Sequence, residues 1–169
     1  YTQHSKTMNV VTGFIATDKG GLTTTLGRGG SDYTAALIAG ALNAEVLEIW
    51  TDVDGVLTSN PRVVSNAYTI PQLSYDEAME LSHFGAKVIY PPTIQPALNK
   101  SIPIYIKNTF NPGFEGTRIS KESSKDDRKK ITGVTSISNI TLLTLEGSGL
   151  MGIPGSAARL FNCLAHHKI

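Results

Sequence analysis

A glycine-rich stretch at residues 23–36, TTTLGRGGSDYTAA, combines residue types that suit the binding of an anion. Gly27, Gly29 and Gly30 can adopt positive φ and let a ligand approach the backbone. Amides at the N-terminus of a following helix favour negative charge, and the Arg28 guanidinium can bind a carboxylate or phosphate through two parallel hydrogen bonds. The stretch therefore predicts a site for a carboxylate, a phosphate or both, although a plain strand-to-helix turn has the same composition.

Asp32 follows this turn and places a negative charge where an anion would bind. Such a charge is useful if the ligand also carries an ammonium group. It is also useful if a lysine or Mg²⁺ links Asp32 to a phosphate.

A second stretch, WTDVDGVLTSNPR at residues 50–62, follows a predicted strand and carries Asp52, Asp54 and Arg62. Ligands of α/β proteins bind at loops that follow the carboxyl ends of parallel strands. A calcium loop is excluded, because its terminal glutamate is absent. The alternative is an Asp-Gly turn with surface charges. Lys87, just past a predicted helix, would by itself be an ordinary surface lysine.

These stretches need a framework of strands and helices to hold them. An apolar, β-branched run predicts a buried strand over 9–17, and residues 31–43 predict a helix with Ser31 as its N-cap. Residues 45–51 predict another strand. Strand, helix and strand at this spacing predict a βαβ unit in a parallel sheet.

The next part of the chain continues the alternation. Residues 74–87 begin with a capping box, Ser74 and Glu77, and predict a helix that ends at Gly85. The remaining predictions are a short helix over 91–101, a strand over 102–109 and a loop over 110–120.

Residues 121–130, KESSKDDRKK, contain no apolar residue and predict a linker. Beyond it, residues 140–150 predict a strand followed by a glycine loop. Residues 153–169 predict a helix with an apolar face, on which Cys163 faces a core. The second module is therefore a small α/β piece.

The overall composition is that of a globular domain: 169 residues, 40% hydrophobic and 17% charged. The net charge of +1 argues against nucleic-acid or membrane-surface binding. A single cysteine excludes a disulfide framework, and no apolar run is long enough to span a membrane, so a cytoplasmic location is expected. Both ends of the sequence have the pattern of a fragment.

Residues 23–36, 50–62 and 74–97, with IPIYIKNTFNPGFEGTRIS at 102–120, resemble the second half of the aspartokinase catalytic domain, within the amino acid kinase family. Residues 131–169 resemble the first ACT regulatory module of aspartokinases. Their sequence is more similar to that of bifunctional aspartokinase–homoserine dehydrogenases than to that of the one-activity enzymes. The resemblance implies a partial three-layer αβα fold, carbamate kinase-like, over 1–120. A linker at 121–130 and the first strand and helix of a ferredoxin-like ACT domain over 131–169 would follow.

The family transfers the γ-phosphoryl group of ATP to the β-carboxylate of L-aspartate, giving 4-phospho-L-aspartate for lysine, threonine and methionine biosynthesis. The resemblance implies ATP and Mg²⁺ as cofactors and Asp32 as a catalytic residue that orients the catalytic lysine and the substrate. It implies that Arg28 holds the α-carboxylate of aspartate, with Gly29, Gly30 and Ser31 beside the substrate.

The resemblance also implies a set of nucleotide-binding residues: Thr51, Asp52, Leu57, Arg62, Lys87 and Val88. Arg62 and Lys87 would neutralise phosphate charge. Leu57 stands where the family commonly has tyrosine, so its contact with the nucleotide is apolar only.

The resemblance implies that the loop over 146–155 forms part of an effector site for a feedback amino acid, with threonine favoured and lysine possible. Its residues are Gly149, Gly152, Ile153 and Pro154. ACT modules usually pair, so a homo-oligomer is expected.

The Lys-Phe-Gly-Gly motif of the family, whose lysine contacts the phosphates, is absent from these 169 residues. We therefore expect the isolated chain to be inactive. The alternative to an enzyme segment is a non-catalytic regulatory or interaction fragment that carries an amino-acid-sensing ACT segment. A glutamate or acetylglutamate kinase fits the motifs less well.

Overall fold

The computed structural model describes residues 8–83, 88–122, 131–147 and 154–168. The chain divides into two compact units, Tyr1–Ile137 and Ser138–Ile169. Within the described ranges, no helix is long and apolar enough to cross a membrane.

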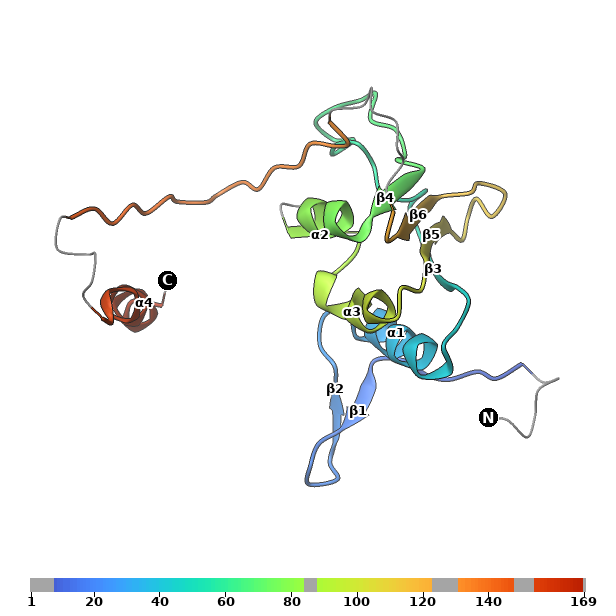
Figure 1. The fold of residues 1–169 in the computed structure, drawn as a ribbon, viewed down its shortest axis with the longest axis horizontal. Helices are drawn as coiled ribbons and strands as arrows, with labels where there is room; N and C mark the ends of the chain where they lie inside the picture. The colour runs from blue at the N-terminus through green and yellow to red at the C-terminus, as the bar shows by residue number, and fades with distance from the viewer. Residues whose placement is uncertain (1–7, 84–87, 123–130, 148–153, 169) are drawn as a thin grey trace. The chain divides into compact units, whose positions relative to one another are not determined.

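The first unit is built on a four-stranded sheet in the order β3-β5-β6-β4 (Figure 1). Its strands are β3 (Leu47–Thr51), β4 (Gln72–Ser74), β5 (Ile104–Asn108) and β6 (Thr117–Ser120). Strands β3 and β5 are parallel, with Thr51 beside Asn108 at their carboxyl ends. Strand β6 pairs antiparallel with β5 and parallel with β4.

Strand β6 corrects the prediction of a loop over 110–120. Residues 110–116 do form a turn region, but Thr117–Ser120 is a strand that is paired on both sides. One of its two partner strands, β4, lies far away in the sequence. Its own four residues are too few to show a periodicity.

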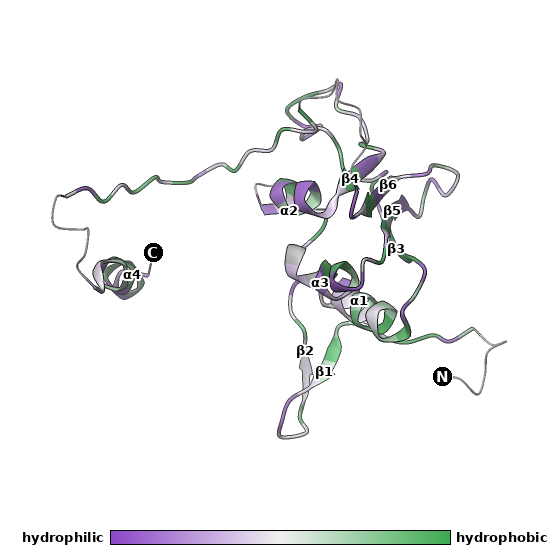
Figure 2. Ribbon diagram, in the orientation of Figure 1, coloured by the Kyte–Doolittle hydropathy of each residue, from purple (hydrophilic) through white to green (hydrophobic). Residues whose placement is uncertain are grey.

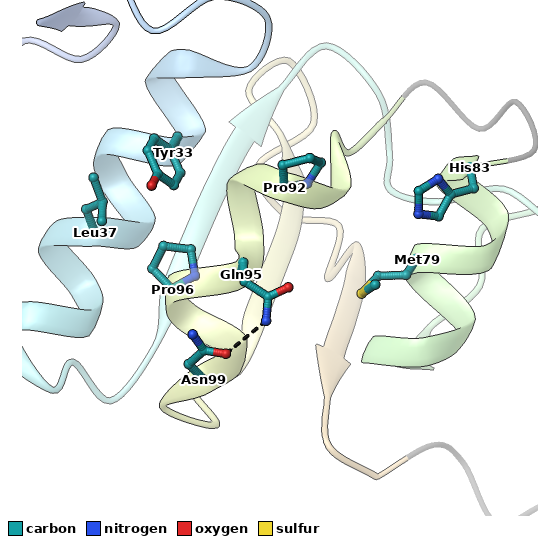
Figure 3. Close-up of a pocket in the computed structure, with 8 residues that line it drawn as sticks. All are labelled: Tyr33, Leu37, Met79, His83, Pro92, Gln95, Pro96 and Asn99. Carbon is teal, nitrogen blue, oxygen red and sulfur yellow. Dashed lines mark hydrogen bonds between the residues drawn. The ribbon is translucent and has the colours of Figure 1, made fainter. Parts of the chain in front are cut away.

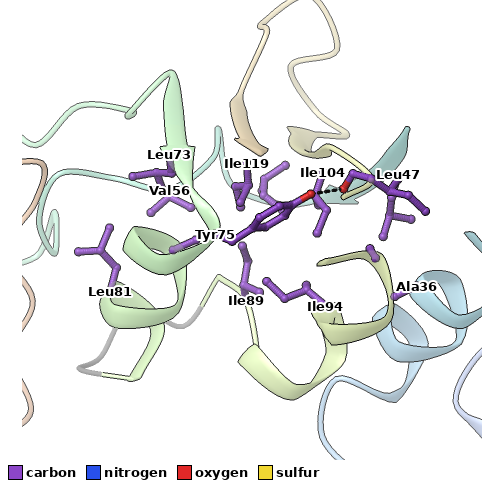
Figure 4. Close-up of a cluster of buried hydrophobic side chains, with 14 of the residues drawn as sticks. Ala36, Leu47, Val56, Leu73, Tyr75, Leu81, Ile89, Ile94, Ile104 and Ile119 are labelled. Atoms are coloured by element: carbon purple, nitrogen blue, oxygen red, sulfur yellow. Dashed lines mark hydrogen bonds between the residues drawn. The ribbon is translucent and has the colours of Figure 1, made fainter. Parts of the chain in front are cut away.

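Three helices cover one face of this sheet: α1 (Gly30–Leu42), α2 (Tyr75–His83) and α3 (Pro91–Asn99). The buried hydrophobic cluster lies between the helices and the strands (Figure 4). Side chains alternate along β3, where Leu47 faces this core while Glu48 and Trp50 are exposed. The predicted α/β class is confirmed, and the described residues form two of its three expected layers.

Helix α2 begins with the predicted capping box. The Ser74 amide donates to Glu77 Oε2 over 2.8 Å, and the Glu77 amide donates to Ser74 Oγ over 3.1 Å. The predicted end at Gly85 lies outside the described residues. Helix α3 forms within the predicted range 91–101, and it begins with Pro91 and Pro92 rather than with Pro92 alone at its first position; the fixed φ of proline suits this first turn.

Of the strand predicted over 9–17, only residues 15–17 form a strand, and both its predicted burial and the βαβ unit are wrong. Strand β1 (Ile15–Thr17) instead forms an antiparallel hairpin with β2 (Thr23–Thr25). The Asp18 carboxylate accepts hydrogen bonds from the amides of Gly20 and Leu22 and closes the turn. Strand β1 is hydrophobic (Figure 2), yet Ile15 is 59% exposed. The local turn chemistry therefore outweighs the apolar pattern.

The first unit extends beyond the predicted linker, whose residues 123–130 lie outside the described ranges. The Thr132 hydroxyl donates to Glu77 Oε1 over 2.7 Å, and the Val134 amide donates to the Thr58 carbonyl over 2.8 Å. Gly133 lies against Leu81 and Thr58. The segment 131–134 therefore packs on α2 and on the loop that precedes β4.

In the second unit, α4 (Ser156–His166) forms as predicted, but residues 140–147 form no strand. A lone strand of this kind has no partner to complete its hydrogen bonds. Cys163 is exposed on α4 rather than facing a core.

Candidate functional site

The glycine turn has the backbone that its composition predicts. Gly27 and Gly29 have φ of 74° and 70°, in the left-handed region. A Cβ on Gly30 would lie 2.8 Å from Leu26 Cβ and 3.0 Å from Phe14 Cδ2. Larger residues at these three positions would therefore disturb the turn.

The predicted N-cap, Ser31, is wrong, because Gly29 occupies the N-cap position of α1. No side chain caps the helix there, and Ser31 is exposed in its first turn. In the first turn of α1 the Gly30 amide donates to the Gly27 carbonyl over 3.1 Å, whereas no side chain caps the amides that follow it, which suits an anion at this end of the helix.

Arg28 is exposed at this turn, and its guanidinium carbon lies 5.6 Å from the centre of the Tyr90 ring. Tyr90 is the N-cap residue of α3. A guanidinium that lies over an aromatic ring still has N–H donors at its own edge, and these remain available to bind a ligand. The turn before α1 and the start of α3 thus meet at Arg28.

Asp32 lies in the first turn of α1 and is half-buried. Desolvation by burial raises the pKa of its carboxyl above the usual value of 3.8. Such a group suits an interaction with a cation or an ammonium group, which would restore the lost solvation.

Thr51 and Asp52 lie at the carboxyl end of β3, as predicted. The Thr51 hydroxyl donates to Asp52 Oδ1 over 3.2 Å, and the Thr51 carbonyl accepts from the Thr109 amide over 2.9 Å. Asp52 is exposed. Both residues therefore lie where parallel sheets bind ligands.

Leu57 and Arg62 lie on the excursion between β3 and β4. Leu57 forms an isolated bridge with Thr69 and is half-buried. The Arg62 amide donates to Asn60 Oδ1 over 3.0 Å, which leaves the exposed Arg62 side chain on a turn. Val88, by contrast, packs against the hydrophobic cluster. Among the residues with described positions, no hydrogen bond or ion pair joins this loop to the turn at 27–32.

Four predicted residues cannot be placed: Lys87, Gly149, Gly152 and Ile153 lie outside the described residues. Pro154 is described and exposed, and it precedes Gly155, the N-cap of α4 with a φ of 87°.

A polar network behind the loop after β3 was not predicted from the sequence. Asp54 Oδ1 accepts hydrogen bonds from Asn108 Nδ2 at 2.9 Å and from Asn111 Nδ2 at 3.2 Å. The two asparagines lie close together at the end of a predicted strand, in the sequence IKNTFN, but nothing in the sequence marks their contact with Asp54.

A cavity of about 600 Å³ lies between α1, α2 and α3 (Figure 3). It is lined by Tyr33, Leu37, Met79, His83, Pro92, Gln95, Pro96 and Asn99. None of the predicted substrate or nucleotide residues lines it. A charged substrate would find no ion-pair partner there other than His83.

No group of three or more His, Cys, Asp or Glu side chains that could hold a metal ion occurs in the described part of the chain. A hard cation such as Mg²⁺ binds through one or two carboxylates together with substrate phosphates. Asp32 fits that requirement as a single carboxylate beside uncapped helix amides.

Comparison with known proteins places these features in context. The model of the amino acid kinase family matches residues 3–108. The bifunctional aspartokinase/homoserine dehydrogenase of Haemophilus influenzae is 47% identical over 156 residues, which are 92% of this chain and 19% of that protein. The lysine-sensitive aspartokinase 3 of Escherichia coli is 42% identical over 160 residues, 95% of this chain and 35% of that protein. The chain thus spans well under half the length of these relatives.

Solved structures agree with this similarity. Escherichia coli aspartokinase III in complex with aspartate and ADP has a TM-score of 0.63 at 48% identity, covering 67% of this chain and 25% of that chain. The same enzyme in complex with lysine and aspartate has a TM-score of 0.63 at 38% identity, covering 92% of this chain and 34% of that chain.

Proposed function

Because this chain belongs to the amino acid kinase family, we propose that it provides part of an aspartokinase, which transfers the γ-phosphoryl group of ATP to the β-carboxylate of L-aspartate. The observation that carries the proposal is the turn before α1, where Arg28 and uncapped helix amides lie together. The names of the relatives and the aspartate and ADP in a similar structure support the choice of substrates.

In this reaction a β-carboxylate oxygen attacks the γ-phosphorus, and the bond to the bridging oxygen of ADP breaks. The nucleophile is already ionised at neutral pH, so no proton has to be removed. Catalysis then depends on positioning two anions and neutralising their charge. Arg28 would hold the α-carboxylate of aspartate, and the amides of Gly29, Gly30 and Ser31 would lie beside the substrate.

Asp32 would orient the substrate and the catalytic lysine, and it is the carboxylate that we assign to Mg²⁺. That ion would neutralise phosphate charge when bound with ATP. Thr51, Asp52 and Leu57 would contact the nucleotide, and Arg62, Lys87 and Val88 would complete its site. Supporting this assignment, Thr51 and Asp52 lie at the carboxyl edge of parallel strands.

We also propose regulation by an amino acid at the loop over 146–155. The uncapped start of α4 suits a carboxylate. Lysine is bound in one similar structure. Threonine is favoured by the sequence GIPGSAARLF, which resembles that of bifunctional aspartokinase–homoserine dehydrogenases. Pairing of such modules between copies would give a homo-oligomer, in a cytoplasmic enzyme.

The proposal is tested in a hybrid in which this chain replaces the matching residues of the Escherichia coli lysine-sensitive aspartokinase 3. We expect Arg28→Ala to raise the KM for aspartate or lower kcat/KM for aspartate by 30-fold or more, roughly 2 kcal/mol or more, while the KM for ATP changes little. Arg28→Lys should recover part of the loss, because it keeps the charge but not the paired hydrogen bonds. Unchanged kinetics for aspartate in Arg28→Ala would rule out this role.

A further inference from the structure

The loop after β3 has no regular secondary structure, yet it carries two of the proposed nucleotide contacts, Asp52 and Leu57. A loop of this kind can contact a ligand with precision only if other parts of the protein fix its conformation. The residues that fix it lie on β5 and β6, and Asn111, just after β5, is a further donor to Asp54 Oδ1 over 3.2 Å.

Asn108, the last residue of β5, holds the middle of this loop. Its Nδ2 donates to Asp54 Oδ1 over 2.9 Å, and its Oδ1 accepts from the Phe110 amide over 2.9 Å. The side chain is only 9% exposed. Because both ends of its amide are engaged within the protein, its orientation is fixed, and its hydrogen bond to Asp54 is strengthened by the carboxylate charge.

A second residue holds the loop immediately afterwards. The Thr117 hydroxyl accepts from the Val56 amide over 2.8 Å and donates to the Ile70 carbonyl over 2.7 Å. Gly55 lies between the two attachments with a φ of 123°. The loop is therefore attached by a side chain of β5 on one side of Gly55 and by a side chain of β6 on the other.

The parallel register relates these attachments to the proposed site. Thr51 pairs with Asn108, so the residue that grips Asp54 lies beside the strand end from which the loop departs. We infer that Asn108 is a positioning residue of the nucleotide site: through Asp54 it fixes the loop that presents Asp52 and Leu57 to the nucleotide. This inference rests on the proposed function for its ligand. It does not place Asn108 in contact with the nucleotide.

The test exchanges donor and acceptor. Asn108→Asp keeps the side-chain shape but sets a second carboxylate against Asp54, which removes the hydrogen bond and adds repulsion. The double variant Asp54→Asn with Asn108→Asp restores one donor and one acceptor in the reverse order, and position 108 can still accept from the Phe110 amide. Asn99→Asp is the matched control, because it makes the same charge change at an exposed asparagine on α3.

Two readouts are measured on the hybrid with Escherichia coli aspartokinase 3 that is described above, which supplies the phosphate-contacting motif that this chain lacks. ATP affinity is followed by isothermal titration calorimetry. Amide hydrogen exchange of residues 52–58 reports how firmly the loop is held. For Asn108→Asp we expect both the Kd for ATP and the exchange rate to rise by about tenfold or more, as for the loss of a hydrogen bond to a charged group. The double variant should return to within about threefold of the unaltered hybrid, and the control should not change.

The inference is overturned if Asn108→Asp exchanges and binds ATP like the unaltered hybrid, or if the double variant is as impaired as the single one. The second outcome would mean that the charge of Asp54, rather than its position, is what matters. If the unaltered hybrid binds no ATP, the proposed nucleotide site fails, and Asn108 loses its role in it even where the exchange data show that it holds the loop.

Discussion

Replacement of Thr117 with valine should lower the free energy of unfolding of the first unit by about 2–4 kcal/mol. Valine has nearly the same shape as threonine, so it leaves no cavity at this fully buried position. It does remove the hydroxyl that joins the Val56 amide to the Ile70 carbonyl, and both residues are buried. Each buried group left without a partner costs about 1–3 kcal/mol. Two such groups give about 2–6 kcal/mol, and relaxation of the loop toward water favours the lower part of that range.

Urea unfolding of the chain, followed by Trp50 fluorescence, measures this loss. The midpoint should fall while the m-value stays constant, because the surface exposed on unfolding is unchanged. Thr117→Ser is the control: it keeps the hydroxyl and deletes one buried methyl group, which costs about 1 kcal/mol. The reasoning is refuted if the valine variant is within about 0.5 kcal/mol of the original chain, on the scale of an ordinary surface substitution. It is equally refuted if serine is the more damaging of the two.

Two further changes test contacts around the same loop and helix α2. Burial raises the pKa of Glu77, but hydrogen bonds from Ser74 and Thr132 outweigh it and hold the pKa below the usual 4.5. Because the folded pKa is the lower one, this carboxylate stabilises the fold above about pH 4.5, and the gain is lost as the pH falls through the folded pKa. Glu77→Gln should therefore reduce the fall of Tm as the pH is lowered below about 4.5, whereas Glu80→Gln, at an exposed residue, should not. The assignment is contradicted if Tm falls with pH in Glu77→Gln as steeply as in the original chain. Gly55→Ala should destabilise the chain by about 2 kcal/mol or more in urea, because the new Cβ would lie 2.5 Å from Thr117 Oγ1 at a φ of 123°. Gly113→Ala, with no atom within 4 Å, should be nearly neutral, and equal effects of the two changes would count against the clash.

The elements that the sequence predicted well are those whose signals are local. The capping box of Ser74 and Glu77 uses two residues three positions apart, and the structure contains both of its hydrogen bonds. The prolines at the start of α3 act through their own fixed φ. Neither feature depends on a distant partner, so a pattern in the chain is sufficient to find it.

The elements that were mispredicted depend on competition or on distant partners. The run at 9–17 has strand composition, but the Asp18 turn pairs its last residues with β2 instead of with the parallel sheet. Ser31 has the composition of a cap, but Gly29 reaches the left-handed conformation at lower cost and takes the position. Strand β6 exists only because β4 and β5 lie on either side of it.

The candidate site divides in the same way. The turn at 27–30 is fixed by the conformation of its own glycines, so its type could be predicted from composition alone. The loop after β3 is fixed by Asn108 and Thr117, which lie 54 and 61 positions beyond the residues that they hold. An aspartate and an asparagine at that separation carry no mark of their contact in one sequence. The consequence is a difference in tolerance: the turn should be damaged mainly by changes at its own glycines, whereas the loop should be damaged both by changes at its own Asp54 and by changes at Asn108, which lies 54 positions later in the sequence.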